Sequence, residues 1–274
     1  MKFLCLPGAY GSAQVCNRAP KSPAYTSLPP EQNFKVQLGP FAAECERTGA
    51  VSLAWTQGTI PAKPPQGFED YFGPGPLYRF FEFDGMEGFE DILDKIRDFP
   101  EGISAEDTMR RLFEGQGDQA PTSYSDENLR KCLDHLFDVI DADPEIEGIL
   151  GYSEGATTAA SLVLEERRRA EEQGIPRRIK AAIFLAGWPP VKLGNGQVHA
   201  LLADECEDVI DIPTCHIVGC YDPYIHGAMA LFNLCDEDTA ELFDHGKGHT
   251  VPRDSVTLRE LGEAVMRLTA KAGN

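Results

Sequence analysis

The chain has 274 residues, of which 42% are hydrophobic, and carries a formal net charge of −19 at pH 7. This charge argues against nucleic acids and anionic membrane surfaces as partners, and no apolar run approaches the ~20 residues of a membrane helix. A chain of this length can bury a full core without disulfide bonds. We therefore expect residues 1–274 to form a single domain.

The cysteines indicate a reducing environment. The chain has eight of them, with no CxxC spacing, and residues 1–6 are too short for a secretory signal. Buried thiols without such a signal are typical of intracellular proteins. Cysteine and histidine do not cluster as metal ligands do. We expect reduced thiols, a cytoplasmic protein, and neither a metal nor another cofactor.

Short apolar segments recur along the chain and predict the strands of one sheet. The first is residues 2–6, and the others are 50–55, 146–150, 180–186, 214–219 and 239–243. Helical stretches separate them, as the crossover connections of a parallel sheet require. The clearest helix runs from Ser125 to Ile140, with Ser125 as its cap and one apolar face. The predicted fold class is α/β, with a mostly parallel central sheet flanked by helices.

Residues 58–122 do not follow this alternation of predicted strands and helices. They begin with Pro61, Pro64 and Pro65, and then hold eight aromatic residues between Phe68 and Phe89, followed by acidic helical pieces near 88–99 and 104–113. We interpret the segment as a lid-like insertion, because such loops commonly carry function. Its aromatic side chains either line an apolar acyl pocket or pack the insertion onto the sheet, and both alternatives stay open.

The pentapeptide Gly-Tyr-Ser-Glu-Gly at 151–155 follows the predicted strand at 146–150 and precedes a helix-forming stretch at 156–169. This order is typical of the nucleophile elbow of an α/β-hydrolase, in which glycines permit a sharp turn and the serine oxygen projects from the sheet edge. A glycine-rich turn without chemistry gives the same short pattern. The assignment of Ser153 as a nucleophile therefore depends on its partners.

The partners occur in the order that this fold uses, an acid and then a histidine. Asp222 follows the strand candidate at 214–219, and His249 lies in a glycine-rich loop 27 residues later. The imidazole would remove the serine proton, and the carboxylate would orient the imidazole. His245 is the competing base. We favour His249, because Gly248 and the turn beyond it free its ring to reach the sheet edge.

Alternative acids and basic clusters have simpler interpretations. Asp204 and Asp208 belong to an acidic run that is typical of a solvated face. The arginines at 167–169 and 177–178 are typical of a solvated helix end. Neither group is assigned to the site.

An oxyanion hole needs two N–H donors. The first expected donor is the backbone N–H of Glu154, directly after the nucleophile. The second should come from the loop after the first strand, Pro7-Gly8-Ala9-Tyr10-Gly11-Ser12. The sequence leaves open whether Ala9 or Tyr10 supplies it.

Six stretches in chain order carry a resemblance that covers nearly the whole chain, namely residues 4–8, 33–41, 72–81, 151–156, 212–222 and 246–249. They resemble the fungal serine hydrolases of the FSH family, within the α/β-hydrolase superfamily. The resemblance places the nucleophile, acid and base at Ser153, Asp222 and His249. Two departures lie beside the oxyanion loop, namely Pro7-Gly8 where the family usually has His-Gly, and a proline-rich insertion at 13–30.

The resemblance implies a serine hydrolase that cleaves an acyl ester or thioester, because the family includes esterases and thioesterases that release polyketide chains. It suggests a small-molecule acyl substrate and, as a macromolecular partner, an acyl-carrier domain of a polyketide synthase. The net charge makes an acidic carrier an awkward partner without a local basic patch. The alternatives are a general carboxylesterase on small esters and a non-catalytic binding protein on the same fold.

Overall fold

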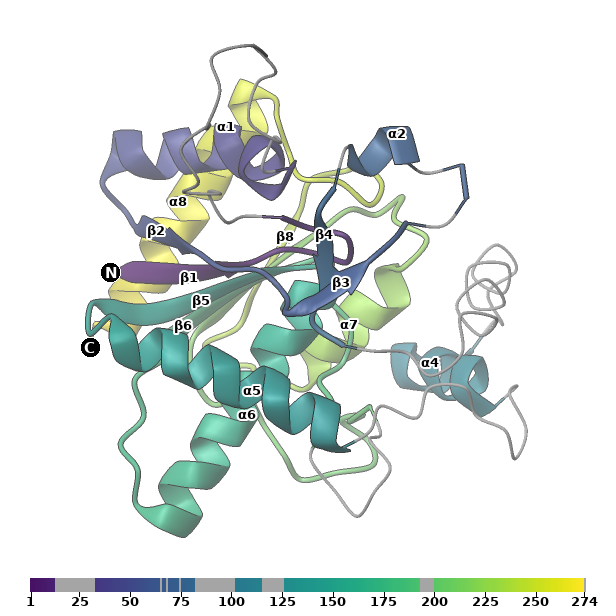
Figure 1. The fold of residues 1–274 in the computed structure, drawn as a ribbon, viewed down its shortest axis with the longest axis vertical. Helices are drawn as coiled ribbons and strands as arrows, with labels where there is room; N and C mark the ends of the chain where they lie inside the picture. Colours follow the sequence, from purple (N-terminus) through teal and green to yellow (C-terminus); the bar gives the residue numbers. More distant parts are fainter. Residues whose placement is uncertain are drawn as a thin grey trace, which may run out of the picture.

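The computed structural model describes residues 1–12, 33–64, 66–67, 69–73, 75–81, 102–114, 126–192 and 200–273. The proline-rich segment 13–30, the predicted helical piece at 88–99 and the predicted cap Ser125 lie outside these residues. Within them, one central sheet is covered by helices on both faces (Figure 1).

The central sheet has six strands in the order β2-β1-β5-β6-β7-β8, and every neighbouring pair is parallel. All six predicted strands are confirmed, and with them the α/β class with a parallel central sheet. Because the strands are parallel, their carboxyl ends meet at one edge of the sheet, where open α/β folds bind ligands. The strands are β1 (Lys2–Leu6), β2 (Ser52–Trp55), β5 (Ile146–Tyr152), β6 (Ala181–Leu185), β7 (Thr214–Val218) and β8 (Glu241–Asp244).

Helices cover both faces of the sheet (Figure 1). One face is covered by α1 (Asn33–Thr48) and α8 (Ser255–Ala272), and the other by α5 (Asp126–Ala142), α6 (Glu154–Gln173) and α7 (Ile225–Asn233). Among the described helices, none combines the length and apolar character that crossing a membrane requires.

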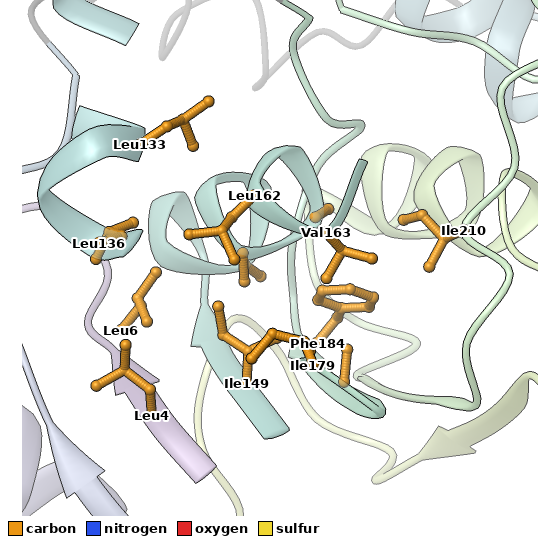
Figure 2. Close-up of a cluster of buried hydrophobic side chains, with 14 of the residues drawn as sticks. Leu4, Leu6, Leu133, Leu136, Ile149, Leu162, Val163, Ile179, Phe184 and Ile210 are labelled. Carbon is orange, nitrogen blue, oxygen red and sulfur yellow. The ribbon is translucent and has the colours of Figure 1, made fainter. Parts of the chain in front are cut away.

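The core follows from the alternation of side chains along the strands. In β1, Leu4 and Leu6 join the cluster beneath α5 and α6, whereas Phe3 and Cys5 join the cluster beneath α1 and α8. Figure 2 shows the first cluster, in which α6 lays Leu162 and Val163 over the sheet. Fully burying one such aliphatic side chain stabilises the fold by about 1.5–3 kcal/mol. The two layers of packing hold the strands rigidly and fix the sheet edge.

The described part of the 58–122 insertion contains a hairpin and two helices. The hairpin pairs β3 (Ile60–Ala62) with β4 (Leu77–Arg79) in antiparallel fashion. The helices are α2 (Glu69–Phe72) and α4 (Ala105–Glu114), the latter close to the predicted piece at 104–113. Directly after β4, Phe80 and Phe81 are 2% and 1% exposed and belong to the main core cluster. These two aromatic residues therefore pack the insertion onto the domain.

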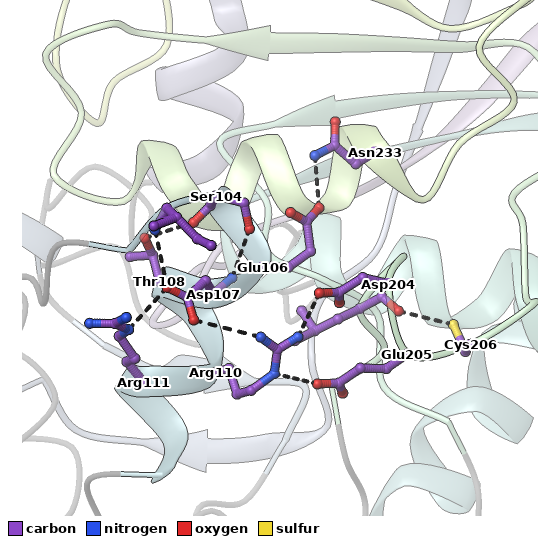
Figure 3. Close-up of polar contacts among 12 residues, drawn as sticks. Ser104, Glu106, Asp107, Thr108, Arg110, Arg111, Asp204, Glu205, Cys206 and Asn233 are labelled. Atoms are coloured by element: carbon purple, nitrogen blue, oxygen red, sulfur yellow. Dashed lines mark hydrogen bonds and ion pairs between the residues drawn. The ribbon is translucent and has the colours of Figure 1, made fainter.

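Helix α4 is fastened to two distant segments (Figure 3). The Arg110 guanidinium pairs with Asp204 and with Glu205, at 2.7 and 2.5 Å. The Asn233 amide of α7 donates to Glu106 Oε1 at 2.7 Å. Asp204 is half-exposed, so its ion pair adds little stability by itself. The pairs fix where the helix lies against α7.

Candidate active site

The peptide at 151–155 forms a sharp turn from β5 into α6. Ser153 has φ 53° and ψ −120°, which is where the first central residue of a type II′ turn lies, a position dominated by glycine. Its N–H donates to the Leu185 carbonyl at the end of β6, at 2.8 Å. Its carbonyl accepts from the N–H groups of Ala156 and Thr157. These bonds hold the strained residue at the carboxyl edge of the sheet.

Both glycines of the pentapeptide are required by close packing. A Cβ at Gly151 would lie 2.3 Å from the Gly155 carbonyl oxygen. A Cβ at Gly155 would lie 2.3 Å from the Pro7 carbonyl oxygen and 2.4 Å from that of Leu6. Side chains at these positions would push α6 away from β5 and β1. The glycines thus let the start of α6 approach both strands, as a nucleophile elbow needs.

Asp222 and His249 form a hydrogen-bonded pair. His249 Nδ1 lies 2.8 Å from Asp222 Oδ2, although 27 residues separate them in the chain. The Asp222 side chain is 1% exposed and that of His249 is 24% exposed. Asp222 Oδ1 also accepts from the Tyr224 N–H at 2.8 Å, which fixes the carboxylate. A buried acid thus orients an accessible imidazole, the arrangement that a catalytic base uses.

The His249 ring lies beside the elbow, between two tyrosines. Its centroid is 5.4 Å from that of Tyr152, the residue directly before Ser153, and 4.7 Å from that of Tyr224. The Tyr152 hydroxyl donates to the His249 carbonyl at 3.3 Å. These contacts bring the Asp222–His249 pair to the same edge of the sheet as Ser153.

His245 has a different environment. It is 9% exposed, and its Nδ1 is buried without a hydrogen-bond partner in the described residues. Burial lowers the pKa of its imidazole. Its backbone N–H donates to the Val218 carbonyl, which continues the pairing of β8 with β7. His245 therefore lies at the end of the sheet, and Asp222 takes His249 as its partner.

The glycine that frees the His249 loop is not Gly248, contrary to the sequence-based argument. Gly248 has an ordinary φ, and a Cβ there would meet nothing closer than the Tyr221 carbonyl oxygen at 3.6 Å. Gly246, with φ 69°, makes the turn. Gly219 lets the two loops approach, because a Cβ there would lie only 2.0 Å from the Lys247 carbonyl oxygen. The Tyr221 N–H donates to that same carbonyl at 3.0 Å.

Asp244 joins the loop that carries Asp222 to the loop that carries His249, a role that the sequence did not reveal. Its Oδ1 accepts from the N–H groups of Cys220, at 3.0 Å, and Gly246, at 2.8 Å. The hydrogen bond from Gly246 is the main cause of a lowered pKa of this carboxyl group. An aspartate two residues before the glycine of a turn is the available signal, since such side chains often bond the backbone two residues on.

Asn33 holds the expected oxyanion loop and was also missed. Its Oδ1 accepts from the Ser12 N–H at 2.8 Å, and its amide donates to the carbonyls of Tyr10, at 2.9 Å, and Phe72, at 3.1 Å. The signal for it is an asparagine at the start of a helix, where this residue type commonly bonds nearby backbone. Asn33 ties the loop after β1 to the insertion.

The loop after β1 lies directly against Ser153. A Cβ at Gly8 would be 3.2 Å from Ser153 Cβ, so glycine brings this backbone close to the elbow. Within the described residues, no hydrogen bond uses the N–H of Ala9, Tyr10 or Glu154. All three expected donors are thus free of a hydrogen bond within the described residues, and the choice between Ala9 and Tyr10 stays open.

The other titratable residues considered for a site are either buried within the sheet or paired with residues of opposite charge. In the part of the chain that the structure describes, no three His, Cys, Asp or Glu side chains gather as metal ligands do. His216 is buried inside β7, where desolvation lowers its pKa to about 3. The arginines at 167–169 and 177–178 all pair with acidic side chains and are only 20–33% exposed, so ion pairs occupy them rather than solvent alone. Arg177 and Arg178 lie beyond the end of α6, so they are not a helix end as the sequence suggested. Asp208 pairs with Lys192.

Comparisons with known proteins agree with this geometry. Esterase FPY3 of Fusarium mangiferae is 33% identical over 153 residues, which cover 54% of this chain and 68% of that protein. Hydrolase phiM of Fungal sp. (strain ATCC 74256) is 24% identical, over 87% of this chain and 89% of that protein.

Solved structures and a family model extend the comparison. The structure of Arabidopsis thaliana SOBER1 shares the fold, with a TM-score of 0.50 and 12% identity, over 98% of each chain. The model described as "Serine hydrolase (FSH1)" matches residues 31–261. The match spans the turn at 151–155 and the Asp222–His249 pair, so the chain belongs to the FSH1 family of serine hydrolases and is a hydrolase.

Proposed function

We propose that Ser153, His249 and Asp222 form the catalytic triad of an acyl ester or thioester hydrolase. The 2.8 Å bond from His249 Nδ1 to a buried carboxylate, beside a strained serine at a sheet edge, is the observation that carries this proposal. Strained backbone of this kind is typical of functional positions. His245, the competing base, has no hydrogen-bond partner at its Nδ1 among the described residues.

The mechanism follows from the positions of these groups. His249 removes the proton of the Ser153 hydroxyl as the serine oxygen attacks the acyl carbon. The tetrahedral oxyanion is stabilised by the N–H of Glu154 and by that of Ala9 or Tyr10. His249 then gives its proton to the leaving alcohol or thiol, which leaves an acyl group on Ser153. A water molecule, deprotonated by His249, releases the acid and restores the serine.

For the substrate, we propose an acyl thioester of fungal secondary metabolism, with a polyketide chain as the acyl group. The support is the resemblance to family members that release such chains, together with aromatic side chains at the sheet edge. Tyr224 and Trp188 are in contact, with centroids 5.9 Å apart, and both are partly exposed. An apolar acyl chain can pack against such a surface. A general carboxylesterase with small substrates is the second candidate.

Labelling with a fluorophosphonate probe tests the nucleophile. The wild-type protein should become labelled at Ser153, and Ser153→Ala should remain unlabelled while keeping its fold and losing several orders of magnitude in turnover. Ser161, on the same helix, is the matched control, because Ser161→Ala should leave labelling intact. Undiminished labelling of a folded Ser153→Ala protein contradicts the assignment.

A series of acyl thioesters and matched esters tests the substrate class. Each added methylene that becomes buried contributes about 0.8 kcal/mol, so kcat/KM should rise roughly three- to fourfold per carbon until the pocket is full. Activity confined to acetyl esters would instead support the small-ester carboxylesterase.

A further inference from the structure

Glu154 brings a negative charge to the place where the reaction would generate another. Its backbone N–H is the first expected oxyanion donor, and its carboxylate belongs to the same residue. The Glu154 side chain is only 8% exposed, so water screens its charge weakly. An uncompensated carboxylate here would oppose the developing oxyanion, whereas an oxyanion hole must stabilise it.

Arg79 and the backbone of Phe80 occupy both carboxylate oxygens. The Arg79 Nε and Nη2 donate to Glu154 Oε2 at 2.8 and 2.5 Å. The Phe80 N–H donates to Oε1 at 2.7 Å. The Arg79 side chain is 11% exposed, so the ion pair is largely shielded from water. Such charge-assisted bonds are short and directional, and they fix the carboxylate in place.

The strand that carries Arg79 also touches the other half of the expected oxyanion hole. The Arg79 guanidinium lies over the Tyr10 ring, 5.5 Å from its centroid. The Tyr78 N–H of β4 donates to the Gly11 carbonyl at 3.3 Å. The backbone of Arg79 packs directly against Gly58. A Cβ at Gly58 would lie only 2.0 Å from the Arg79 carbonyl oxygen, so only glycine allows this contact. Strand β4 thus links the elbow to the loop after β1.

We propose that Arg79 is a positioning residue that neutralises the Glu154 carboxylate and thereby lets the adjacent N–H stabilise the oxyanion. This inference rests on the proposed function of Ser153. It assigns the insertion a part in the chemistry through a residue that does not touch the substrate. Arg79, at the end of β4, also contacts the ring of Tyr10 in the loop after β1.

A double-substitution experiment separates charge compensation from general support of the fold. Arg79→Met should lower kcat by roughly one to two orders of magnitude, while KM changes little, because the loss is confined to the transition state. Inhibition by a trifluoromethyl ketone, whose adduct carries an oxyanion, should weaken by a similar factor. Arg79→Met combined with Glu154→Gln should recover most of kcat, because no buried charge remains uncompensated. Arg110→Met, which removes another paired arginine of the insertion, should leave kcat unchanged.

Two results would overturn the inference. One is a double variant that is as slow as Arg79→Met, which would make Arg79 a purely structural residue. The other comes from Arg79→Lys, which keeps the compensating positive charge, should keep kcat within about threefold of the wild type, and remains informative if Arg79→Met does not fold. A tenfold or larger loss in a folded Arg79→Lys protein would mean that the positive charge of Arg79 is not what the site needs. Fluorophosphonate labelling of the same wild-type preparation tests Ser153 separately: labelled protein without rescue refutes the role of Arg79 alone, whereas unlabelled protein refutes both proposals.

Discussion

Replacing Gly219 by alanine should push the loop that carries Asp222 away from the loop that carries His249. The added Cβ would lie 2.0 Å from the Lys247 carbonyl oxygen and 2.8 Å from that of Gly248. Ordinary contact begins at 3.4 Å, so the His249 loop must shift by about 1.4 Å, unless the Asp222 loop moves instead. The bond from the Tyr221 N–H to the Lys247 carbonyl would be disturbed by either movement.

A displacement of about 1 Å in a catalytic geometry can cost about 100-fold in rate. We therefore expect Gly219→Ala to lower kcat/KM by about two orders of magnitude. Overpacking of this kind typically destabilises by about 1–3 kcal/mol, and each kcal/mol lowers the Tm of a chain this size by roughly 2–4 °C. The protein should remain folded at 25 °C, so the loss can be measured on a native protein by ester hydrolysis and thermal unfolding.

Gly248→Ala is the matched control for this experiment. Its Cβ would meet only the Tyr221 carbonyl oxygen, at 3.6 Å, and its φ is ordinary. It should keep kcat/KM within about threefold of the wild type, since surface substitutions of this kind usually have small effects. If Gly219→Ala also stays within that range, or if the two variants lose equal activity, the close approach of the two loops does not position the triad.

Two further predictions concern the histidines. His249→Ala should cost nearly as much activity as Ser153→Ala, with little further loss in the double variant, whereas His245→Ala should keep most of the turnover; an inactive His245→Ala with an active His249→Ala would reverse the assignment. His216 has its pKa lowered from 6.5 to about 3 by burial, so the folded state binds fewer protons than the unfolded state in that window, and stability must fall as pH drops below 6.5. His216→Leu should therefore lose about 2 kcal/mol less than the wild type between pH 7 and pH 5, measured by urea unfolding; equal losses would mean that another group causes the acid sensitivity.

The sequence predicted those features whose cause is local. Each strand of the sheet is a short apolar run between turn signals, and burial on both faces requires such a run. The elbow was visible because its glycines are required at fixed positions, as the contacts at Gly151 and Gly155 demonstrate. The meeting of Asp222 and His249 could be predicted because both follow the ends of strands, and parallel strands end at one edge.

Features that depend on long-range contacts were not visible. The 75-residue separation between Arg79 and Glu154 hides their ion pair from any pattern in the chain. The freedom of the His249 loop was assigned to Gly248, because the sequence shows a glycine but not which backbone it faces. In the same way, aromatic residues such as Phe80 and Phe81 could serve a pocket or a core, and only packing decides that they belong to the core.

The backbone of Ser153 also has a consequence for how the chain can evolve. A non-glycine residue held at this φ and ψ costs of order 1–3 kcal/mol, and the surrounding hydrogen bonds must compensate for it. Glycine at this position would relieve the strain and remove the proposed nucleophile, so we expect an inactive variant to be the more stable one. Mutation toward greater stability and selection for turnover therefore act in opposite directions at this one residue. In a gene copy that is no longer under selection for activity, a single substitution at this position would give a more stable protein without catalytic activity.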